Sequence, residues 1–242
     1  MMKRLILDDA FQALFPDAAL AVLCVHLGPE ARRPAEAQAD EVRTLLAQAN
    51  LEARKHLTSD VISENAIPAR WREAYRRFPT KKGARCSIEN LLKRVLHDKP
   101  LSSIAPTVDL TNAISLRYGF PIGAEDLDAF VGDLHLGAMK GTEDFLPLGK
   151  DAQDPPLPGE IGYYDEAGAV CRCWNWRDGR RTAVTDGTVN EFIVMECIEP
   201  HRMEDLRAAQ AELTDLLKKY AGAEVLACGL VTAQAPEMVI AG

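Results

Sequence analysis

The sequence lacks any apolar run long enough to cross a membrane, because no stretch approaches the roughly 18 residues that a spanning helix needs. It also lacks a signal peptide: the apolar part of MMKRLILDD is short and two aspartates follow it at once. The composition is otherwise ordinary, with 47% hydrophobic and 26% charged residues, so the 242-residue chain can bury a substantial core. These features predict a cytoplasmic protein that does not bind membranes.

Metal-ligand spacing is missing as well. Cys171 and Cys173 are the only close pair among the six cysteines, and the five histidines are scattered. A zinc site needs four convergent ligands, so we predict neither a metal nor a cofactor. Cys24, Cys197 and Cys228 lie in apolar, strand-like runs and are predicted to be small buried hydrophobes.

Common catalytic and nucleotide-binding motifs are absent. The sequence contains no G-x-S-x-G, H-E-x-x-H, G-x-x-x-x-G-K-[ST] or G-x-G-x-x-G. Nothing in the spacing of the scattered histidines brings a Ser-His-Asp triad together. Any hydrolytic chemistry must therefore rely on other groups.

The net charge of −8 conceals an uneven distribution. Residues 70–94 contain nine Lys or Arg and two Glu, a local charge of +7, so the remainder carries −15. A basic patch on an acidic body suits a partner with an anionic backbone that is bound in one orientation. The alternative is a solvated helix face next to a flexible basic loop.

Hydrophobic periodicity predicts an α+β fold, with mixed β-sheets and packed helices. The length suits a single structural domain in which residues 1–64 form a strand-helix part packed on a core of residues 65–242. Ser87 is predicted to cap a helix, and the chain is predicted to end in a β-α-β unit. The predicted strands are 20–27, 134–138, 145–148, 161–164, 169–174, 192–198 and 225–231, and the predicted helices are 36–56, 67–78, 87–97, 107–118 and 203–220.

Two segments carry most of the functional information. The first, PTVDLTNAISLRYGFP (106–121), places Asp109 and Asn112 at the start of a short amphipathic helix. The second, CWNWRDGRRTAVTDGT (173–188), concentrates polar and aromatic side chains where a predicted strand runs into a loop. Strand alternation predicts that Trp174 and Trp176 share one face, unless the loop starts between them, and that Asn175 lies on the other.

Both segments resemble the tRNA-editing region of the phenylalanyl-tRNA synthetase beta subunit, the B3/4 domain. There a VDxTN helix runs into a turn, and a later Gly-rich loop ends in a VTD-like strand start. The strings PIGAEDLDAF (121–130) and WNWRDG (174–179) are more similar to the free-standing relatives of that domain. The resemblance covers about residues 65–230 and implies an editing-domain-like fold.

This sequence departs from the synthetase pattern at two places. The synthetase domain carries His, Ala and Asp after the helix, where this chain reads GAE (123–125). The synthetase loop carries GGE-type residues, where this chain reads DGRR (178–181). The tyrosine specificity and the catalytic groups of the synthetase therefore do not carry over directly.

The resemblance implies a trans-editing aminoacyl-tRNA deacylase that hydrolyses the ester of a mischarged tRNA. Such an ester is already activated, so the enzyme need only hold it, polarise its carbonyl and position a water. One free-standing branch acts on arginine tRNA mischarged with canavanine, an arginine mimic. A pocket for that cation calls for a bidentate carboxylate.

Candidate residues follow from the matched motifs. Asp126 and Asp178 each come directly after a motif and are the first choices for a cationic group, although acidic residues in such loops are commonly only solvated. Asn112 either bonds substrate or caps its own helix. The full assignment is Asn112, Asn175 and Asp178 for catalysis; Glu125, Asp126, Trp174, Trp176 and Arg177 for substrate; and Arg76, Arg77, Lys81, Lys82, Arg85, Lys93 and Arg94 for tRNA.

Two other functions compete with this interpretation. The histidine missing at position 123 and the missing GGE-type acid motivate a catalytically inactive tRNA- or RNA-binding module. The third candidate is a small-molecule amidase or esterase that does not use RNA.

Overall fold

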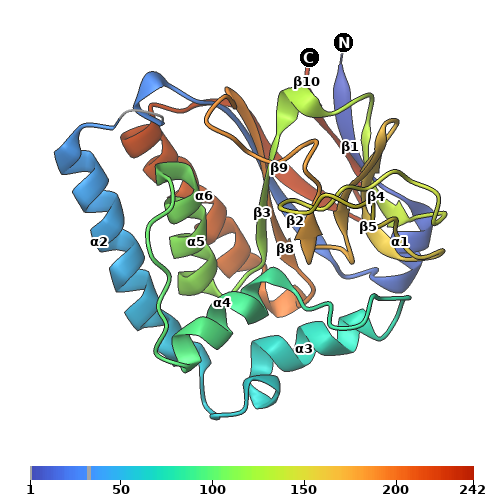
Figure 1. Cartoon of the computed structure of the whole chain (residues 1–242), viewed down its shortest axis with the longest axis horizontal. Helices are drawn as coiled ribbons and strands as arrows, with labels where there is room; N and C mark the ends of the chain where they lie inside the picture. The colour runs from blue at the N-terminus through green and yellow to red at the C-terminus, as the bar shows by residue number, and fades with distance from the viewer. Residues whose placement is uncertain (1, 32–33) are drawn as a thin grey trace.

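Two β-sheets form the centre of the molecule (Figure 1). The computed structural model describes residues 2–31 and 34–242. The four-stranded sheet is antiparallel, in the order β3 (Ile122–Asp126), β8 (Asn190–Cys197), β2 (Ala19–His26) and β9 (Glu224–Thr232). The six-stranded sheet has β1 and β4 parallel and its other neighbours antiparallel, in the order β10 (Glu237–Ala241), β1 (Lys3–Leu7), β4 (Leu134–Ala138), β5 (Ile161–Asp165), β6 (Gly168–Arg172) and β7 (Arg177–Asp178).

Helices cover the four-stranded sheet on the face that points away from the second sheet (Figure 1). This layer consists of α2 (Glu36–Glu52), α5 (Pro106–Tyr118) and α6 (Met203–Ala221). Two further helices, α3 (Ala66–Tyr75) and α4 (Ser87–Leu96), run below the sheets in this view, and α1 (Asp9–Leu14) lies beside the six-stranded sheet. The predicted α+β class is confirmed.

The central position of β2 explains why its sequence is apolar throughout and does not alternate between apolar and polar residues. Leu20, Val22 and Cys24 pack into the core between the two sheets. Leu23 and Val25 pack on the opposite face, into the helical layer. Because both faces of β2 are covered, every residue from Ala19 to Val25 is buried.

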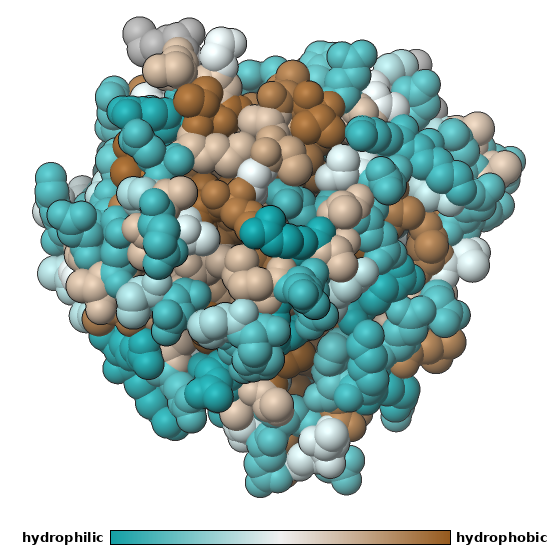
Figure 2. Space-filling view, turned by 180° about the vertical axis from the view of Figure 1, so that it is seen from behind, coloured by the Kyte–Doolittle hydropathy of each residue, from teal (hydrophilic) through white to brown (hydrophobic). Residues whose placement is uncertain are grey.

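The outer strand β9 is more exposed. Val225, Leu226 and Cys228 are exposed on it, so the prediction that Cys228 is buried is wrong, whereas Cys24 and Cys197 are buried as predicted. Seen from behind, the surface is largely hydrophilic, and hydrophobic side chains gather in the upper half of that face (Figure 2). None of the helices in the described ranges is both long and apolar enough to span a bilayer.

Most predicted elements are present within a few residues of their expected bounds. Two predictions about strands are wrong. Strand β9 does not close the chain, because β10 follows it and pairs with β1 in the other sheet. The expected strand at 145–148 is irregular: Pro147 makes one isolated bridge, to Gly179. Proline has no N–H with which to continue a ladder.

Ser87 does not cap α4. The helix begins at Ser87 itself, its N-cap is Cys86, and the buried Ser87 hydroxyl has no hydrogen-bond partner within the described chain. The β-α-β unit β8-α6-β9 is present, and β2 lies between its two parallel strands.

A buried ion pair joins β6 to the segment before β5. Arg172 is 1% exposed and Glu160 is fully buried, and two bonds of 2.9 and 2.7 Å join the guanidinium to the carboxylate. The same carboxylate accepts the Cys173 and Leu157 N–H groups, both at 2.9 Å. Glu160 therefore holds the end of the proline-rich 153–160 connection against the turn that follows β6.

Breaking this pair should destabilise the fold strongly. We expect Arg172→Met to lower the free energy of unfolding by about 3–5 kcal/mol, because buried Glu160 loses its charged partner. Glu160→Gln should cost less, because Asp154 still lies 3.0 Å from the Arg172 guanidinium. The double variant Glu160→Met/Arg172→Met should cost less than the sum of Arg172→Met and Glu160→Met. Chemical denaturation measures all four.

The exposed pair Arg54–Asp98 provides the control, since its side chains are 56% and 81% exposed. Arg54→Ala should change the free energy of unfolding by less than about 1 kcal/mol. Equally small losses at Arg172 and Arg54 would contradict a structural role for the buried pair.

Candidate functional site

A small cavity lies between the two sheets. Strands β3 and β8 of the four-stranded sheet form one wall, and β4, β5, β6 and β7 of the six-stranded sheet form the other. The cavity encloses about 70 Å³, which is room for more than one water or for the end of a small side chain. Its polar lining consists of Ser87, Glu125, Tyr163, Cys171, Asn175, Asp178 and Glu196, and its aromatic lining includes Trp174, Trp176 and Phe192. We call it the interlayer cavity.

An unusual turn brings three consecutive side chains into this cavity. Strand β6 ends at Arg172, and Cys173 and Trp174 have φ values of 46° and 64°, in the left-handed region. Non-glycine residues adopt that region at a cost, and such strain gathers at functional sites. Trp174, Asn175 and Trp176 therefore all line the cavity, and the predicted strand alternation at these positions is wrong.

A chain of buried hydrogen bonds fixes Asn175. Tyr75 of α3 donates its hydroxyl to Asn175 Oδ1 at 2.9 Å. Asn175 Nδ2 donates to Glu196 Oε2, and the Tyr163 hydroxyl donates to Glu196 Oε1 at 2.7 Å. Because one N–H of the Asn175 amide has no partner among the described residues, Asn175 is held firmly yet keeps a donor for a ligand.

Three carboxyl groups line the cavity, and burial weakens their acidity. Loss of hydration raises the pKa of Glu125 well above its ordinary value, and the nearby Asp178 raises it further. Burial raises the pKa of Glu196 to about 8. Partial loss of hydration also raises the pKa of Asp178, but this residue is exposed, so burial affects it less than Glu125 and Glu196. No Lys or Arg is among the lining residues, and Arg181 and Arg177, which lie outside the lining, offset the raised pKa values of Glu125 and Asp178 only in part.

Several polar atoms of this cavity lack partners within the described residues. They are Ser87 Oγ, Glu125 Oε2 and the Trp174 indole N–H. A buried polar atom without a hydrogen bond is costly, so each is a position where a bound molecule would be stabilised. The arrangement can hold a cation or a strong hydrogen-bond donor beside the carboxyls.

The second sequence segment meets here the residues that follow the first one. Gly123 and Glu125 lie in the 121–130 string directly after the first segment, and Trp174, Asn175, Trp176 and Asp178 come from the second segment. Glu196, Tyr163 and Ser87 were not predicted as site residues. The one signal for Glu196 was a lone acid inside the apolar strand FIVMEC (192–197).

The predicted catalytic residue Asn112 and the predicted substrate residues Asp126 and Arg177 lie outside the cavity lining. Asn112 is on α5 in the helical layer, where neighbouring Asp109 accepts the Ile104 N–H at 2.8 Å and so fixes the helix start. Asp126 accepts the Asp128 N–H at 3.0 Å. The Arg177 guanidinium stacks over the Trp176 ring, 4.8 Å from its centroid.

The basic residues of the 70–94 stretch differ in the partners they contact. Arg70, Arg72, Lys81 and Arg85 form ion pairs with Glu or Asp. Arg77 donates to the Leu14 carbonyl, at 2.9 Å. Within the described ranges no ion pair involves the exposed Arg76, Lys82, Lys93 or Arg94.

A buried acid, Glu191, lies beside Asp126 on the face of the four-stranded sheet that points away from the interlayer cavity. Glu191 of β8 is fully buried, pairs in register with Asp126 of β3, and has no hydrogen-bond partner for either oxygen in the described chain. Loss of hydration, with a smaller contribution from Asp126, raises the pKa of Glu191 to about 7. Among residues 2–31 and 34–242, no group of three or more His, Cys, Asp or Glu has the arrangement of a metal site.

Comparison with known proteins identifies a family. The B3/4 domain matches residues 70–222. Among solved structures, an N-terminal fragment of the phenylalanyl-tRNA synthetase beta-subunit from Pyrococcus horikoshii aligns over 91% of this chain and 49% of that one, with 14% identity and a TM-score of 0.49. This chain thus spans about half the length of that fragment. No curated protein matches significantly.

Glu191 makes stability depend on pH. Its pKa is near 4.5 in the unfolded chain and about 7 in the folded protein, so stability from this group is complete below pH 4.5 and is lost as pH rises through 7. Glu191→Gln removes this titration. The free energy of unfolding of the variant minus that of the wild type should therefore rise between pH 4.5 and 7 and then level off, as urea denaturation at several pH values would measure.

The matched control is Glu224→Gln, at the exposed end of β9. It should leave the shape of the wild-type pH profile unchanged. A constant difference between Glu191→Gln and wild type across the same pH window would show that Glu191 does not titrate there.

Proposed function

Because the chain belongs to the B3/4 domain family, we propose that it is a trans-editing aminoacyl-tRNA deacylase. It would hydrolyse the ester of a mischarged tRNA in the cytoplasm, and canavanyl-tRNA(Arg) is our candidate substrate. The observation that carries the proposal is the interlayer cavity, where the 121–130 string, the 173–188 segment and β8 enclose three acids and buried polar atoms that lack partners among the described residues.

The residues of the cavity suit hydrolysis without a protein nucleophile. An aminoacyl ester needs its carbonyl polarised and a water positioned beside it. Asn175, held by Tyr75 and Glu196, offers an N–H to the carbonyl oxygen. Asp178 lines the cavity and remains accessible to water, and a raised pKa suits a general base near neutral pH.

The acids also suit a cationic amino acid. Glu125 is buried with one oxygen unpartnered, and no cation lines the cavity. A guanidinium-like side chain would supply both the missing charge and paired donors to a carboxylate. Its arrival would remove the repulsion between Glu125 and Asp178 and lower the pKa of both. Glu125 is therefore the residue we assign to the substrate side chain.

One alternative is a catalytically inactive tRNA-binding module. The observation that favours it is Gly123 at a position where the synthetase domain carries a histidine, since Gly123 lines the cavity and adds no side chain. Tight tRNA binding without turnover, undiminished by Asn112→Ala with Asp178→Ala, would support it. Deacylation of free aminoacyl esters as fast as of aminoacyl-tRNA would instead indicate a small-molecule esterase.

A panel of mischarged tRNAs, with canavanyl-tRNA(Arg) included, tests the proposal directly. We expect the wild type to deacylate at least one. Asp178→Asn should lower kcat about 100-fold or more, because the positioned base is lost. Glu125→Gln should act mainly through KM for a cationic aminoacyl group. Deacylation is followed by loss of radiolabelled amino acid from the tRNA.

Asp186→Asn is the matched control, because it alters an exposed acid of the same segment outside the cavity lining. It should retain the wild-type rate, and thermal unfolding should show that all three variants fold. A wild-type protein that leaves every mischarged tRNA intact would overturn the deacylase proposal.

A further inference from the structure

We propose that a groove lined by Arg72, Arg76 and Arg85 binds the phosphate backbone at the 3′ end of the RNA whose aminoacyl group enters the interlayer cavity. This inference rests on the proposed function and adds to it a location for the polynucleotide. We call this feature the arginine groove.

The arginine groove lies between α3 and the 80–89 segment and has a volume of about 160 Å³. Glu89, which is 3% exposed, holds the Arg72 guanidinium by two bonds of 3.0 and 2.6 Å. The same carboxylate lies 3.6 Å from Arg85. One acid therefore orients two arginines and leaves a positive excess, and exposed Arg76 has no ion pair among the described residues.

The arginine groove and the interlayer cavity share a wall. Tyr75 lines the groove, and its hydroxyl bonds to Asn175 in the cavity. Cys86 lines the groove, and the next residue, Ser87, presents an unpartnered hydroxyl to the cavity. Trp71 of the groove packs edge-on against Trp174 of the cavity, with ring centroids 5.0 Å apart. Only a single layer of side chains thus separates the groove from the cavity.

The two neighbours suit groups of opposite charge, since the cavity favours a cation and the groove favours an anion. Three acids line the cavity and three arginines, opposed by one acid, line the groove. An aminoacyl ester at the end of an RNA has the same polarity, with a cationic α-ammonium group at one end and phosphates on the other side of the terminal nucleoside. Arginine suits phosphate because its planar donors bind two oxygens at once. Charge and adjacency together place the phosphates in the groove.

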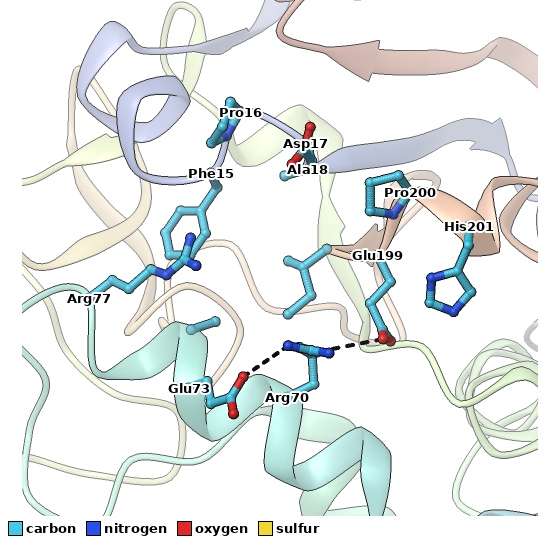
Figure 3. Close-up of a pocket in the computed structure, with 12 residues that line it drawn as sticks. Phe15, Pro16, Asp17, Ala18, Arg70, Glu73, Arg77, Glu199, Pro200 and His201 are labelled. Atoms are coloured by element: carbon cyan, nitrogen blue, oxygen red, sulfur yellow. Dashed lines mark hydrogen bonds and ion pairs between the residues drawn. The ribbon is translucent and has the colours of Figure 1, made fainter.

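A second hollow on the opposite side of α3 does not offer free cations. Figure 3 shows Arg70 between Glu73 and Glu199, at 3.0 and 3.6 Å, and Arg77 against the Phe15 ring. Asp17 also lines this hollow. Its arginines are already engaged by carboxylates or an aromatic ring, so an anion would have to displace those contacts. The arginine groove is the better phosphate site.

The test compares two charge reversals in the same region of the chain. Arg76→Glu alters the groove, whereas Lys99→Glu alters an exposed residue just after α4 that does not line it. The probe is an unacylated RNA minihelix ending in CCA-3′, and fluorescence anisotropy at several salt concentrations gives Kd. We expect Arg76→Glu to raise Kd tenfold or more and Lys99→Glu to raise it less than threefold. Arg76→Ala should reduce the salt slope by about 1.

Equal weakening by Arg76→Glu and Lys99→Glu, or no binding of the minihelix by wild type, would overturn the arginine groove. Thermal unfolding confirms that each variant folds, and Arg85→Ala provides a second groove variant that should weaken binding in the same way. Aminoacyl-adenosine, which has the ester but no phosphate, should be deacylated equally by wild type and Arg76→Glu. A wild type that binds the minihelix at the groove but deacylates nothing would refute the proposed function alone.

Discussion

The geometry of the site depends on the buried ion pair between Arg172 and Glu160. Its carboxylate accepts the backbone N–H of Cys173, the first residue of the left-handed turn. That turn rotates Trp174 and Asn175 out of strand geometry and into the interlayer cavity. A buried charge pair is poor evidence of added stability, since removing two ions from water is costly. Here the pair instead specifies one backbone path where extended strand would otherwise continue.

The interlayer cavity combines a rigid part with an unsatisfied part. Hydrogen bonds from Tyr75, Tyr163 and Asn175 link α3, β5 and β8 into one buried network, so these side chains have little freedom. Opposite them, Glu125 and Ser87 retain polar atoms without partners in the described chain. Such a division is typical of a binding site, because the fixed groups set the shape while the open ones are satisfied by the ligand.

The distribution of charge has the same logic. The molecule is acidic overall, yet nine of its 28 Lys and Arg lie in residues 70–94, the stretch that contains α3 and α4. Ion pairs within that stretch neutralise some cations and orient others, as Glu89 does for Arg72. Whether a lysine or arginine can bind an anion therefore depends on the side chains around it. The count of nine basic residues in the sequence does not show which of them are already paired.

The sequence by itself determined the α+β class, the bounds of most elements and the two stretches, 121–130 and 173–188, that meet at the cavity. These features follow from local patterns, such as the apolar run of β2 and the helical spacing of apolar residues in α6. Such patterns involve only residues that are close together in the sequence. The family was also readable from the two motifs. Five of the candidate residues, Glu125, Trp174, Asn175, Trp176 and Asp178, share one cavity because each lies on or beside a matched motif.

Only the tertiary structure decided which residues complete the site. Glu196 and Tyr163 are 33 positions apart in the chain, and Tyr75 and Asn175 are 100 apart, so no local pattern links them. The left-handed turn at Cys173 depends on Glu160, a residue at the end of what reads as a surface loop. Strand β10 likewise forms only because β1 offers an edge at the far end of the chain. Such long-range pairings arise from tertiary packing, so they could be identified only from the structure.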